Sequence, residues 1–342
     1  MKEDLLVHRT AVTALSVSGP ESADVSVVMP ALNEAGSIGS LLETLAAQSV
    51  RVSEVIVVDA GSTDGTRSEA EARAERFPCF RVLLEPGAYP GKARNVGARA
   101  ARAEWLLFLD CGVSIGPDCI QRLVDRQSTA KTDVVFGRVV PKTSTFFTEC
   151  AAVAYVPPST LGGGPVARPT VQLALIRKSV FERTGGFPEH LRSGEDLLFL
   201  RKLEQLGVDA SFAPEAVTCW DLAPDVKATF RRFRIYSSNN LLAGLAREWH
   251  LRIGAYYVML GAIGFLATWV SGSPFLIPVL FGIFMATRSI KSVWIHGEVQ
   301  RPSLSRRVSQ AFLVIVILCI IDAATFLGAC DFIWQKHYPS KG

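Results

Sequence analysis

The chain has 342 residues, of which 49% are hydrophobic, with a formal net charge of +4 and a mean hydropathy of +0.26. The mean hydropathy is too high for an ordinary soluble domain, and the small net charge, without a basic run interleaved with aromatic residues, argues against a nucleic-acid partner. The seven cysteines form no C-x-x-C pair and no metal-binding spacing with the five histidines, which favours reduced thiols over disulfides or a zinc site.

The apolar residues are distributed unevenly. The first 250 residues have the composition of a globular domain, and the last 90 or so contain long apolar runs with few charges. This division predicts one soluble domain followed by a membrane module. Residues 1–20 lack the apolar core and cleavage site of a signal peptide, so we expect none.

The first part of the soluble domain alternates strands and helices. Apolar runs at 25–29, 55–58 and 81–84 predict three strands, and the segment 66–76 predicts a helix. The helix between the first two strands is indicated by apolar residues that share one helix face: Ile38, Leu41, Leu42, Leu45 and Ala46. This order is typical of a right-handed parallel α/β sheet, which is the predicted fold class.

The apolar run from Leu106 to Leu109 predicts a further strand that is buried on both faces. It ends at Asp110, and the turn-forming residues Gly112 and Gly116 follow. Ligands bind beyond the carboxyl ends of the strands in an open α/β sheet, so Asp110 is either a ligand contact or a solvated strand end.

The block Gly91–Asn95 opens a helix that leads into this strand. Lys92, Asn95 and Arg99 are spaced i, i+3, i+7 and share one helix face. Lys92 is either a solvated residue at the helix start or a cation held over a phosphate, aided by the positive end of the helix. Because the helix leads into the strand that ends at Asp110, we favour the interpretation of Lys92 as a phosphate-binding cation.

Four blocks carry a resemblance to a known family: P-A-L-N-E at 30–34, V-V-D-A-G-S-T-D-G-T at 57–66, G-K-A-R-N-V-G at 91–97 and F-L-D-C-G at 108–112. In their order and spacing the chain resembles family 2 glycosyltransferases over about residues 23–245. The resemblance implies the GT-A fold, a Rossmann-like domain that binds a nucleoside-diphosphate sugar.

The resemblance also implies a set of donor-binding residues: Pro30, Leu32, Glu34, Asp59, Lys92 and Asp110. The first three would line the nucleoside pocket, and Asp59 would accept a hydrogen bond from the base. Lys92 would lie near the ribose or the diphosphate. Asp110 would be the first acid of the D-x-D metal motif.

The chain departs from the family pattern at Gly112, where the second Asp usually stands. A divalent cation that bridges a diphosphate needs oxygen ligands, and Mg²⁺ normally takes one or two carboxylates plus substrate phosphates. We therefore expect a divalent cation, Mg²⁺ or Mn²⁺, to be bound weakly through Asp110. Relatives with Gly or His at this place resemble bacterial exopolysaccharide transferases of the succinoglycan type.

The second part of the domain carries the predicted acceptor chemistry. A glycine-rich loop at 161–165 precedes a strand at 171–176 and a helix at 178–184, and Glu195-Asp196 then opens another helix. The macrodipole and capping favour acids in a first helical turn, which is one explanation of this pair. The other comes from the family resemblance, in which the pair is the E-D motif and Asp196 is the general base. An inverting transfer needs such a base, because the acceptor hydroxyl loses its proton as it attacks the anomeric carbon.

Basic and aromatic residues alternate from Lys227 to Tyr236, beyond a predicted N-cap at Asp225. This is the pattern of a helix at a membrane interface. The segment matches the Q-x-x-R-W motif of processive synthases poorly and is closer to the R-x-x-x-x-Y pattern of non-processive relatives, formed by Arg231 and Tyr236. We therefore expect transfer of a single sugar, with Glu195, Arg231 and Tyr236 as candidates for contact with the acceptor or the diphosphate.

Apolar runs at 253–270, 275–286 and 311–329 predict about three transmembrane helices. Basic residues precede the first run and lie between the second and third. The positive-inside rule then places the catalytic domain in the cytoplasm and the C-terminus outside. Asp322 interrupts the third run, and we expect it to pack against another helix.

The predicted organisation is an N-terminal extension at 1–22, a GT-A domain at 23–225, an interfacial amphipathic helix at 226–250 and a transmembrane module at 251–334. The predicted function is inverting transfer of a sugar from a nucleotide sugar to a hydroxyl of a lipid-linked or envelope glycan. The reaction would take place at the cytoplasmic face of the cell membrane, with membrane lipid as a partner.

Two other functions fit parts of the pattern. Transfer to polyprenyl phosphate would use an acceptor that is already ionised and needs no base, so Glu195-Asp196 argues against it. The other alternative is a membrane scaffold that binds a nucleotide sugar without turnover. It remains an alternative because Gly112 replaces the second Asp of the metal motif.

Overall fold

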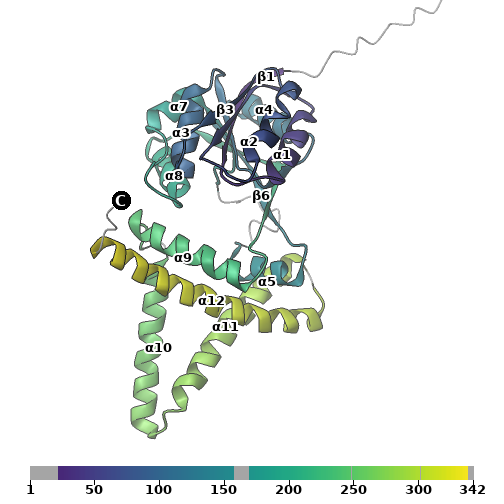
Figure 1. The fold of residues 1–342 in the computed structure, drawn as a ribbon. Helices are drawn as coiled ribbons and strands as arrows, with labels where there is room; N and C mark the ends of the chain where they lie inside the picture. Colours follow the sequence, from purple (N-terminus) through teal and green to yellow (C-terminus); the bar gives the residue numbers. More distant parts are fainter. Residues whose placement is uncertain (1–21, 158–168, 248, 301, 338–342) are drawn as a thin grey trace, which may run out of the picture.

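The computed structural model describes residues 22–157, 169–247, 249–300 and 302–337. These residues form an α/β domain, a base of helices beneath it, and a helical hairpin that projects from the base away from the domain (Figure 1). The predicted glycine-rich loop at 161–165 and nearly all of the predicted N-terminal extension lie outside the described residues.

Strands and helices alternate along the α/β domain, and the longest helices come last. The strands are β1 (Ser22–Ala31), β2 (Arg51–Asp59), β3 (Phe80–Leu84), β4 (Trp105–Leu109), β5 (Val113–Ile115), β6 (Val134–Lys142), β7 (Leu173–Arg177) and β8 (Ala210–Asp221). The helices of the domain are α1 (Ser37–Ala46), α2 (Thr66–Glu71), η1 (Ala74–Arg76), α3 (Pro90–Ala100), α4 (Cys119–Ala130), α7 (Lys178–Thr184) and α8 (Glu195–Gln205). The base consists of α5 (Phe146–Tyr155), α9 (Val226–Leu242) and α12 (Leu304–His337), and the hairpin of α10 (His250–Ser271) and α11 (Leu276–Gln300).

The strands form one mixed sheet in the order β3-β2-β1-β4-β7-β6-β8-β5. β1 pairs in parallel with β2 and β4, and β2 with β3, which confirms the predicted parallel arrangement for this part. β7 lies antiparallel between β4 and β6, so the sheet is not parallel throughout. The reason is the route of the chain, which passes through α5 in the base and so reaches β7 from the end of the sheet where β4 and β6 stop.

The sheet is covered by helices on both faces. In β4, Leu107 and Leu109 belong to the core under α1 and α4, whereas Leu106 and Phe108 belong to the core under α3 and α8. Successive side chains of a strand point to opposite faces, so a strand between two helical layers is apolar at every position. The prediction that this strand is buried on both faces is confirmed.

Two predicted helices show what burial decides. The apolar face of α1 packs into the core as expected. The helix predicted over 66–76 instead ends at Glu71, and η1 follows it as a short 3₁₀ helix. Only Thr66 and Ala70 of α2 are buried and none of η1, so little apolar surface stabilises a longer helix there.

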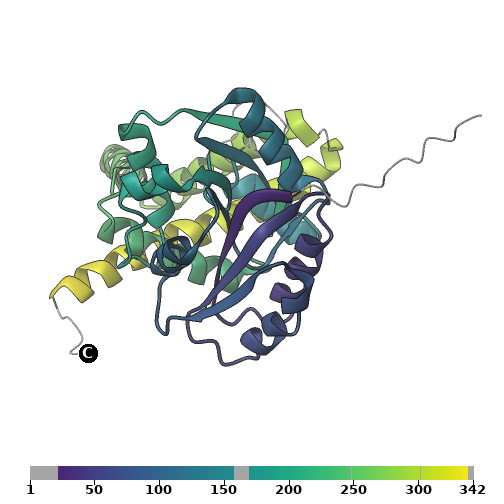
Figure 2. The ribbon, with the colours of Figure 1, turned by 90° about the horizontal axis from the view of Figure 1, so that it is seen from above.

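In the base, α9 and α12 lie side by side beneath the domain (Figures 1 and 2). Asp225 caps α9 as predicted, because its Oδ1 accepts a hydrogen bond from the backbone N–H of Ala228 at 2.7 Å. The two helices approach closely at Gly328, where an added Cβ would lie 2.4 Å from the carbonyl oxygen of Arg234. A larger side chain at 328 would push the helices apart.

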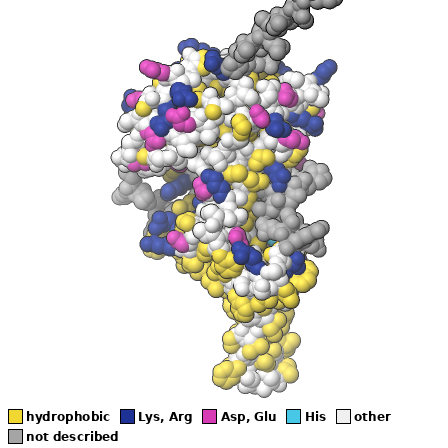
Figure 3. Space-filling view, turned by 90° about the vertical axis from the view of Figure 1, so that its right-hand side faces the viewer, with side chains coloured by type: hydrophobic (Ala, Val, Ile, Leu, Met, Phe, Trp, Pro, Cys, Tyr) yellow, Lys and Arg dark blue, Asp and Glu magenta, His cyan; other side chains and the backbone are white. Residues whose placement is uncertain are grey.

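The three predicted apolar runs are α10, α11 and α12, and each is long and apolar enough to cross a membrane. Hydrophobic side chains cover the hairpin, whereas charged side chains gather on the α/β domain and along the base (Figure 3). Asp322 of α12 is 2% exposed and accepts hydrogen bonds from Arg288 of α11 and from Tyr257 of α10, the latter at 2.8 Å. As expected, Asp322 packs against other helices, and it ties all three together.

We expect Asp322→Ala to destabilise the detergent-solubilised protein by about 2 kcal/mol, because it leaves the Arg288 guanidinium without its partner among apolar helices. Thermal unfolding of the full chain measures the loss. The control is Asp331→Ala, which removes the exposed pair with Arg234 and should cost less than about 1 kcal/mol. Equal losses in the two variants would contradict a special role for Asp322.

Candidate active site

A cleft of about 900 Å³ opens at the carboxyl ends of β1 and β4, on the side of the domain that faces the base. Its walls come from the end of β1, the segment before α3, the residues after β4, and the facing parts of β8 and α9. Among the predicted site residues, Pro30, Leu32, Glu34, Asp110 and Tyr236 line it. The prediction that ligand-binding residues follow the parallel strands therefore agrees with the position of the cleft.

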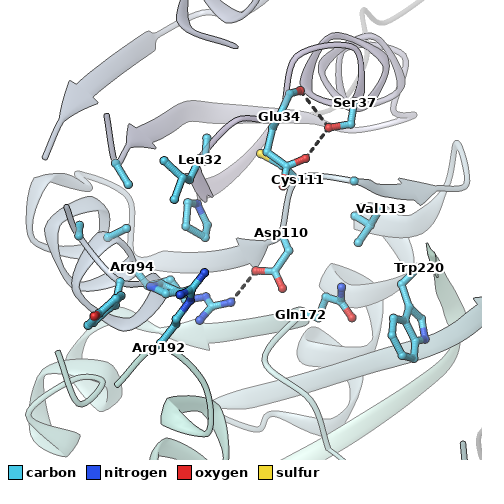
Figure 4. Close-up of a pocket in the computed structure, with 18 of the residues that line it drawn as sticks. Leu32, Glu34, Ser37, Arg94, Asp110, Cys111, Val113, Gln172, Arg192 and Trp220 are labelled. Carbon is cyan, nitrogen blue, oxygen red and sulfur yellow. Dashed lines mark hydrogen bonds and ion pairs between the residues drawn. The ribbon is translucent and has the colours of Figure 1, made fainter. Parts of the chain in front are cut away.

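Arg94 of α3 joins the two halves of the site. Its Nη2 donates to Asp110 Oδ1 at 2.5 Å (Figure 4), and its Nη1 donates to Glu195 Oε1 at 2.7 Å. Arg94 is 5% exposed and Glu195 is also 5% exposed, so both charges are buried. One guanidinium thus fixes the end of β4 relative to the start of α8.

The electrostatics of this bridge follow from burial. Burial alone would lower the pKa of Arg94, but the carboxylates of Asp110 and Glu195 outweigh it and raise the pKa. The pKa of Glu195 is raised by burial, although Arg94 lowers it and the charge of Asp196 adds to the rise. A buried charge that loses its partner is strongly unfavourable, so the bridge is a structural requirement of the site.

Asp196 lies in a second cavity of about 360 Å³ that shares Arg94, Asp110 and Tyr236 with the first cleft. Burial raises the pKa of its carboxyl, and Arg94 opposes the rise. The N-cap of α8 is Gly194, and Asp196 Oδ1 accepts a hydrogen bond from the adjacent N–H of Leu197 at 2.8 Å. Asp196 is therefore not a capping residue. Of the two structural reasons for an acidic pair at a helix start, capping does not apply to Asp196 and only the macrodipole does.

Glu34 lies in the wall of the cleft near Asp110, and its Oε2 accepts from Ser37 Oγ at 2.6 Å (Figure 4). Burial raises the pKa of Glu34, the bond from Ser37 lowers it, and the charge of Asp110 raises it further. Burial is the main cause of this rise, and repulsion from the nearby carboxylate of Asp110 is a smaller one.

Two predicted donor residues do not line the cleft. Asp59 is 2% exposed, and its Oδ1 accepts from the N–H groups of Gly61 and Ser62 and from Ser62 Oγ, so it shapes the loop after β2. Lys92 lies on α3 with its Nζ 2.6 Å from Glu85 Oε1. It is Arg94, two positions further along, that reaches into the cleft.

In α9 the cleft is lined by Arg232 and Tyr236, whereas the predicted Arg231 is exposed outside the lining. The Arg232 guanidinium lies over the Trp220 ring, 5.9 Å from its centroid. Its Nη1 is buried and has no hydrogen-bond partner among the described residues. Arg232 Nη1 is therefore available to donate a hydrogen bond to a phosphate oxygen in the cleft.

Among the described residues there is no cluster of three or more His, Cys, Asp or Glu side chains that could hold a metal ion. Arg94 occupies Asp110 Oδ1, and no described side chain donates to Asp110 Oδ2. A Cβ at Gly112 would lie 3.7 Å from Glu34 Oε2, and the φ of +78° favours glycine. Asp110 and Glu34 could therefore hold a divalent cation together with a diphosphate, with Glu34 near the place of the missing second Asp.

The residues that sequence reasoning missed are Arg94 and Arg232. Arg94 lies in the same block, G-K-A-R-N, as Lys92. The argument that a cation near the start of this helix can bind a phosphate applies to Arg94 as well. Arg232 adjoins Arg231, and the choice between neighbours depends on the rotation of α9, which the sequence pattern leaves open.

The chain matches the protein-family model described as glycosyl transferase family 2 over residues 26–183. It is 30% identical to glycosyltransferase AglE of Haloferax volcanii over 220 residues, which are 62% of this chain and 71% of AglE. It is also 30% identical to the succinoglycan biosynthesis protein ExoO of Rhizobium meliloti over 209 residues, which are 56% of this chain and 59% of ExoO.

Among solved structures, the mannosyltransferase PcManGT from Pyrobaculum calidifontis, in complex with GDP-Man and Mn²⁺, superimposes with a TM-score of 0.53 at 19% identity. The match covers 93% of this chain and 90% of PcManGT. At this identity the similarity establishes the fold alone.

Proposed function

This chain belongs to glycosyltransferase family 2 and is a glycosyltransferase with the GT-A fold, and we propose that it performs an inverting transfer from a nucleoside-diphosphate sugar to a hydroxyl acceptor. The observation that carries the proposal is the bridge from Asp110 through Arg94 to Glu195. It connects the end of β4, where family 2 enzymes are expected to hold the donor diphosphate, to the first turn of α8, where the candidate base stands.

The proposed role of each residue follows from the position of its side chain in the cleft. Pro30, Leu32 and Glu34 at the end of β1 suit contact with the nucleoside. Asp110 would hold the diphosphate through a divalent cation, which supplies positive charge against the leaving phosphates. Arg232 would donate to a diphosphate oxygen from the opposite wall. Asp59 would contribute indirectly, by holding the loop after β2 in place beside the donor. Lys92 would lie near the ribose or the diphosphate.

In the chemical step, the acceptor oxygen attacks the anomeric carbon as the bond from that carbon to the diphosphate oxygen breaks. The hydroxyl proton moves to the carboxylate of Asp196, and the electron pair of the breaking bond leaves on the nucleoside diphosphate. Attack opposite the leaving group inverts the configuration. Burial raises the pKa of Asp196, which makes it a stronger base than an ordinary Asp, and Arg94 opposes part of that rise.

We propose a lipid-linked or envelope glycan as the acceptor. The cavity that holds Asp196 is lined by Tyr155 and Val156 at the end of α5, and α5 packs against α11 and α12. An acceptor attached to the membrane would thus reach the base from the side of the apolar helices. Tyr236 lies in both cavities, which suits a residue between donor and acceptor.

The proposed location is the cytoplasmic face of the cell membrane, with the GT-A domain at 23–225, interfacial residues at 226–250 and the membrane part at 251–334. The apolar helices support anchoring. Arg247 before α10, Arg252 in its first turn, and Arg306 and Arg307 in the first turn of α12 support the cytoplasmic side under the positive-inside rule.

Replacing Asp110 with Asn should abolish measurable donor binding or weaken it at least about tenfold, because it removes the carboxylate that faces the diphosphate and its cation. Calorimetric titration with UDP-, GDP- and dTDP-sugars, with and without Mn²⁺, measures the effect. The matched control is Asp221→Asn, since Asp221 also lines the cleft but pairs with Lys142 on the far wall. Unchanged affinity for the donor that the original chain binds would refute the assignment of Asp110.

A turnover assay with the nucleotide sugar that binds, run with different acceptors, separates the other functions. A scaffold would bind a nucleotide sugar without ever releasing the free nucleoside diphosphate, whatever acceptor is added. A polyprenyl-phosphate transferase would turn over with polyprenyl phosphate and would be insensitive to loss of the base at Asp196.

A further inference from the structure

The three apolar helices do not run in one direction. α10 and α11 extend away from the α/β domain as a hairpin, whereas α12 runs crosswise above the hairpin, against α9 and α5 (Figure 1). The view from above shows α12 along its length beneath the domain (Figure 2). A membrane entered by the hairpin therefore cannot also be crossed by α12 in this arrangement.

Both ends of α12 are tied to the base by charged side chains. Near its start, Arg306 makes a bidentate pair with Glu149 of α5, with contacts of 2.6 and 2.8 Å. Near its end, Asp331 makes a bidentate pair with Arg234 of α9, with contacts of 2.6 and 2.7 Å. The two pairs are 25 residues apart, or about 37 Å along a helix. If α12 crossed the bilayer, its two ends would lie on opposite sides of the membrane, and either Glu149 of α5 or Arg234 of α9 would have to lie across the membrane from the α/β domain.

The apolar surface of α12 is divided between two faces. One face, with Val314, Ile317 and Ile321, is buried against the base and the hairpin. The opposite face carries exposed apolar side chains along the whole helix: Leu304, Val308, Phe312, Val316, Leu327 and Trp334. The first four recur every fourth residue, so they form a continuous stripe. Of its most apolar stretch 44% is buried inside the protein, against 6% for α10.

We propose that α12 lies in the plane of the membrane, with this stripe at the boundary between headgroups and acyl chains, and that only the α10–α11 hairpin enters the bilayer. The C-terminus would then lie on the same side of the membrane as the α/β domain. The proposal rests on the proposed membrane anchoring. It replaces the expectation of a C-terminus outside, which counted α12 as a crossing because of its hydropathy alone.

The occupant of the stripe is lipid. Hydrophobic side chains continue from the hairpin onto the lower part of the base (Figure 3), and the hairpin itself exposes apolar side chains such as Val258, Phe265 and Trp269. An in-plane helix with one apolar face gains free energy from sinking that face to a depth of about 5–10 Å. Arg306 and Lys336, near the two ends of α12, lie where they can meet phosphate headgroups.

Spin labels test the orientation in the full chain reconstituted in lipid vesicles. Cysteines replace Val308, Ala323 and Trp334 on α12, one at a time, in a Cys330→Ser background whose own labelling is subtracted. Power saturation with oxygen and a nickel chelate gives the depth of each label. We expect the three depths to agree within about 5 Å, whereas a crossing helix would place the label at 323 roughly 15 Å deeper than the other two.

Labels on α10 provide the matched control. Val258→Cys and Val270→Cys are equally exposed positions 12 residues apart, and Val270 lies next to the turn of the hairpin, so if the hairpin crosses the bilayer the label at 258 should lie roughly 10 Å deeper than the label at 270. Similar, shallow depths on α10 would refute the membrane anchoring itself. A graded depth on α10 with a deep label at 323 would refute only the in-plane orientation. Labels on α12 shielded from both oxygen and nickel would show that a second copy of the chain covers the stripe, which also overturns the proposal.

Terminal tags give an independent result. In sealed vesicles, a protease added from one side should remove an N-terminal and a C-terminal epitope tag together or spare both. Removal of one tag with protection of the other would place the ends on opposite sides and overturn the proposal.

Discussion

The variant Asp196→Asn is expected to turn over roughly 10²–10⁴-fold more slowly than the original chain while binding the donor with nearly unchanged affinity. Asparagine keeps the shape of the side chain and the bond from the Leu197 N–H. It cannot take the proton of the acceptor hydroxyl. In the proposed site the donor would be held on the other side of Arg94, by Asp110 and the end of β1, so its binding should not depend on this carboxylate.

Three measurements on one preparation test this expectation: melting temperature, donor affinity and the rate of nucleoside-diphosphate release with acceptor. If Asp196 only favours the start of α8, the change should cost about 1 kcal/mol of stability or less, and turnover per folded molecule would stay the same. Asp125→Asn, on the exposed face of α4, controls for the loss of a helical carboxylate. A folded, donor-binding variant with normal turnover would rule out Asp196 as the base.

The pH dependence of the activity also tests Asp196 as the general base. The base is active when ionised, and burial raises the pKa of Asp196. Activity should therefore fall, as the pH is lowered, at a higher pH than an ordinary Asp would require. In the residual activity of Asp196→Asn this acid limb should be lost.

Replacing Arg94 with Met is expected to destabilise the protein by about 3–5 kcal/mol, which corresponds to a fall of roughly 10 °C in melting temperature. Methionine fills part of the space but leaves the Glu195 carboxylate buried without a partner. Thermal unfolding at several pH values measures the loss. Turnover should fall with it, because β4 and α8 lose their connection.

The sign of the pH effect identifies the cause. Arg94 lowers the pKa of Glu195 against the effect of burial, so its removal raises that pKa further. A carboxyl with a raised pKa in the folded state destabilises the protein when ionised and stops doing so once protonated. The loss should therefore shrink as the pH falls through the raised pKa. The double variant Arg94→Met with Glu195→Gln should recover most of the stability at neutral pH. No recovery would show that Arg94 acts through packing alone.

The local pattern determined several parts of this protein. Short continuous apolar runs located β1, β2 and β4, and apolar residues spaced along one helix face located α1, because such patterns lie in neighbouring residues. The four sequence blocks predicted the family, which the comparisons confirmed. Asp110 was predicted at the cleft because a single acid after a fully buried strand has its place fixed by that strand.

The tertiary structure alone decided the rest. Arg94 meets Glu195 across 101 positions of sequence, and no local periodicity records such a pair. Which of Arg231 and Arg232 lines the cleft depends on how α9 is rotated against the domain. The hydropathy of α12 reports its composition, but its direction is fixed by ion pairs with α5 and α9, which are distant in sequence. Composition and period are properties of neighbouring residues, whereas sites and orientations arise from contacts between segments far apart in the chain.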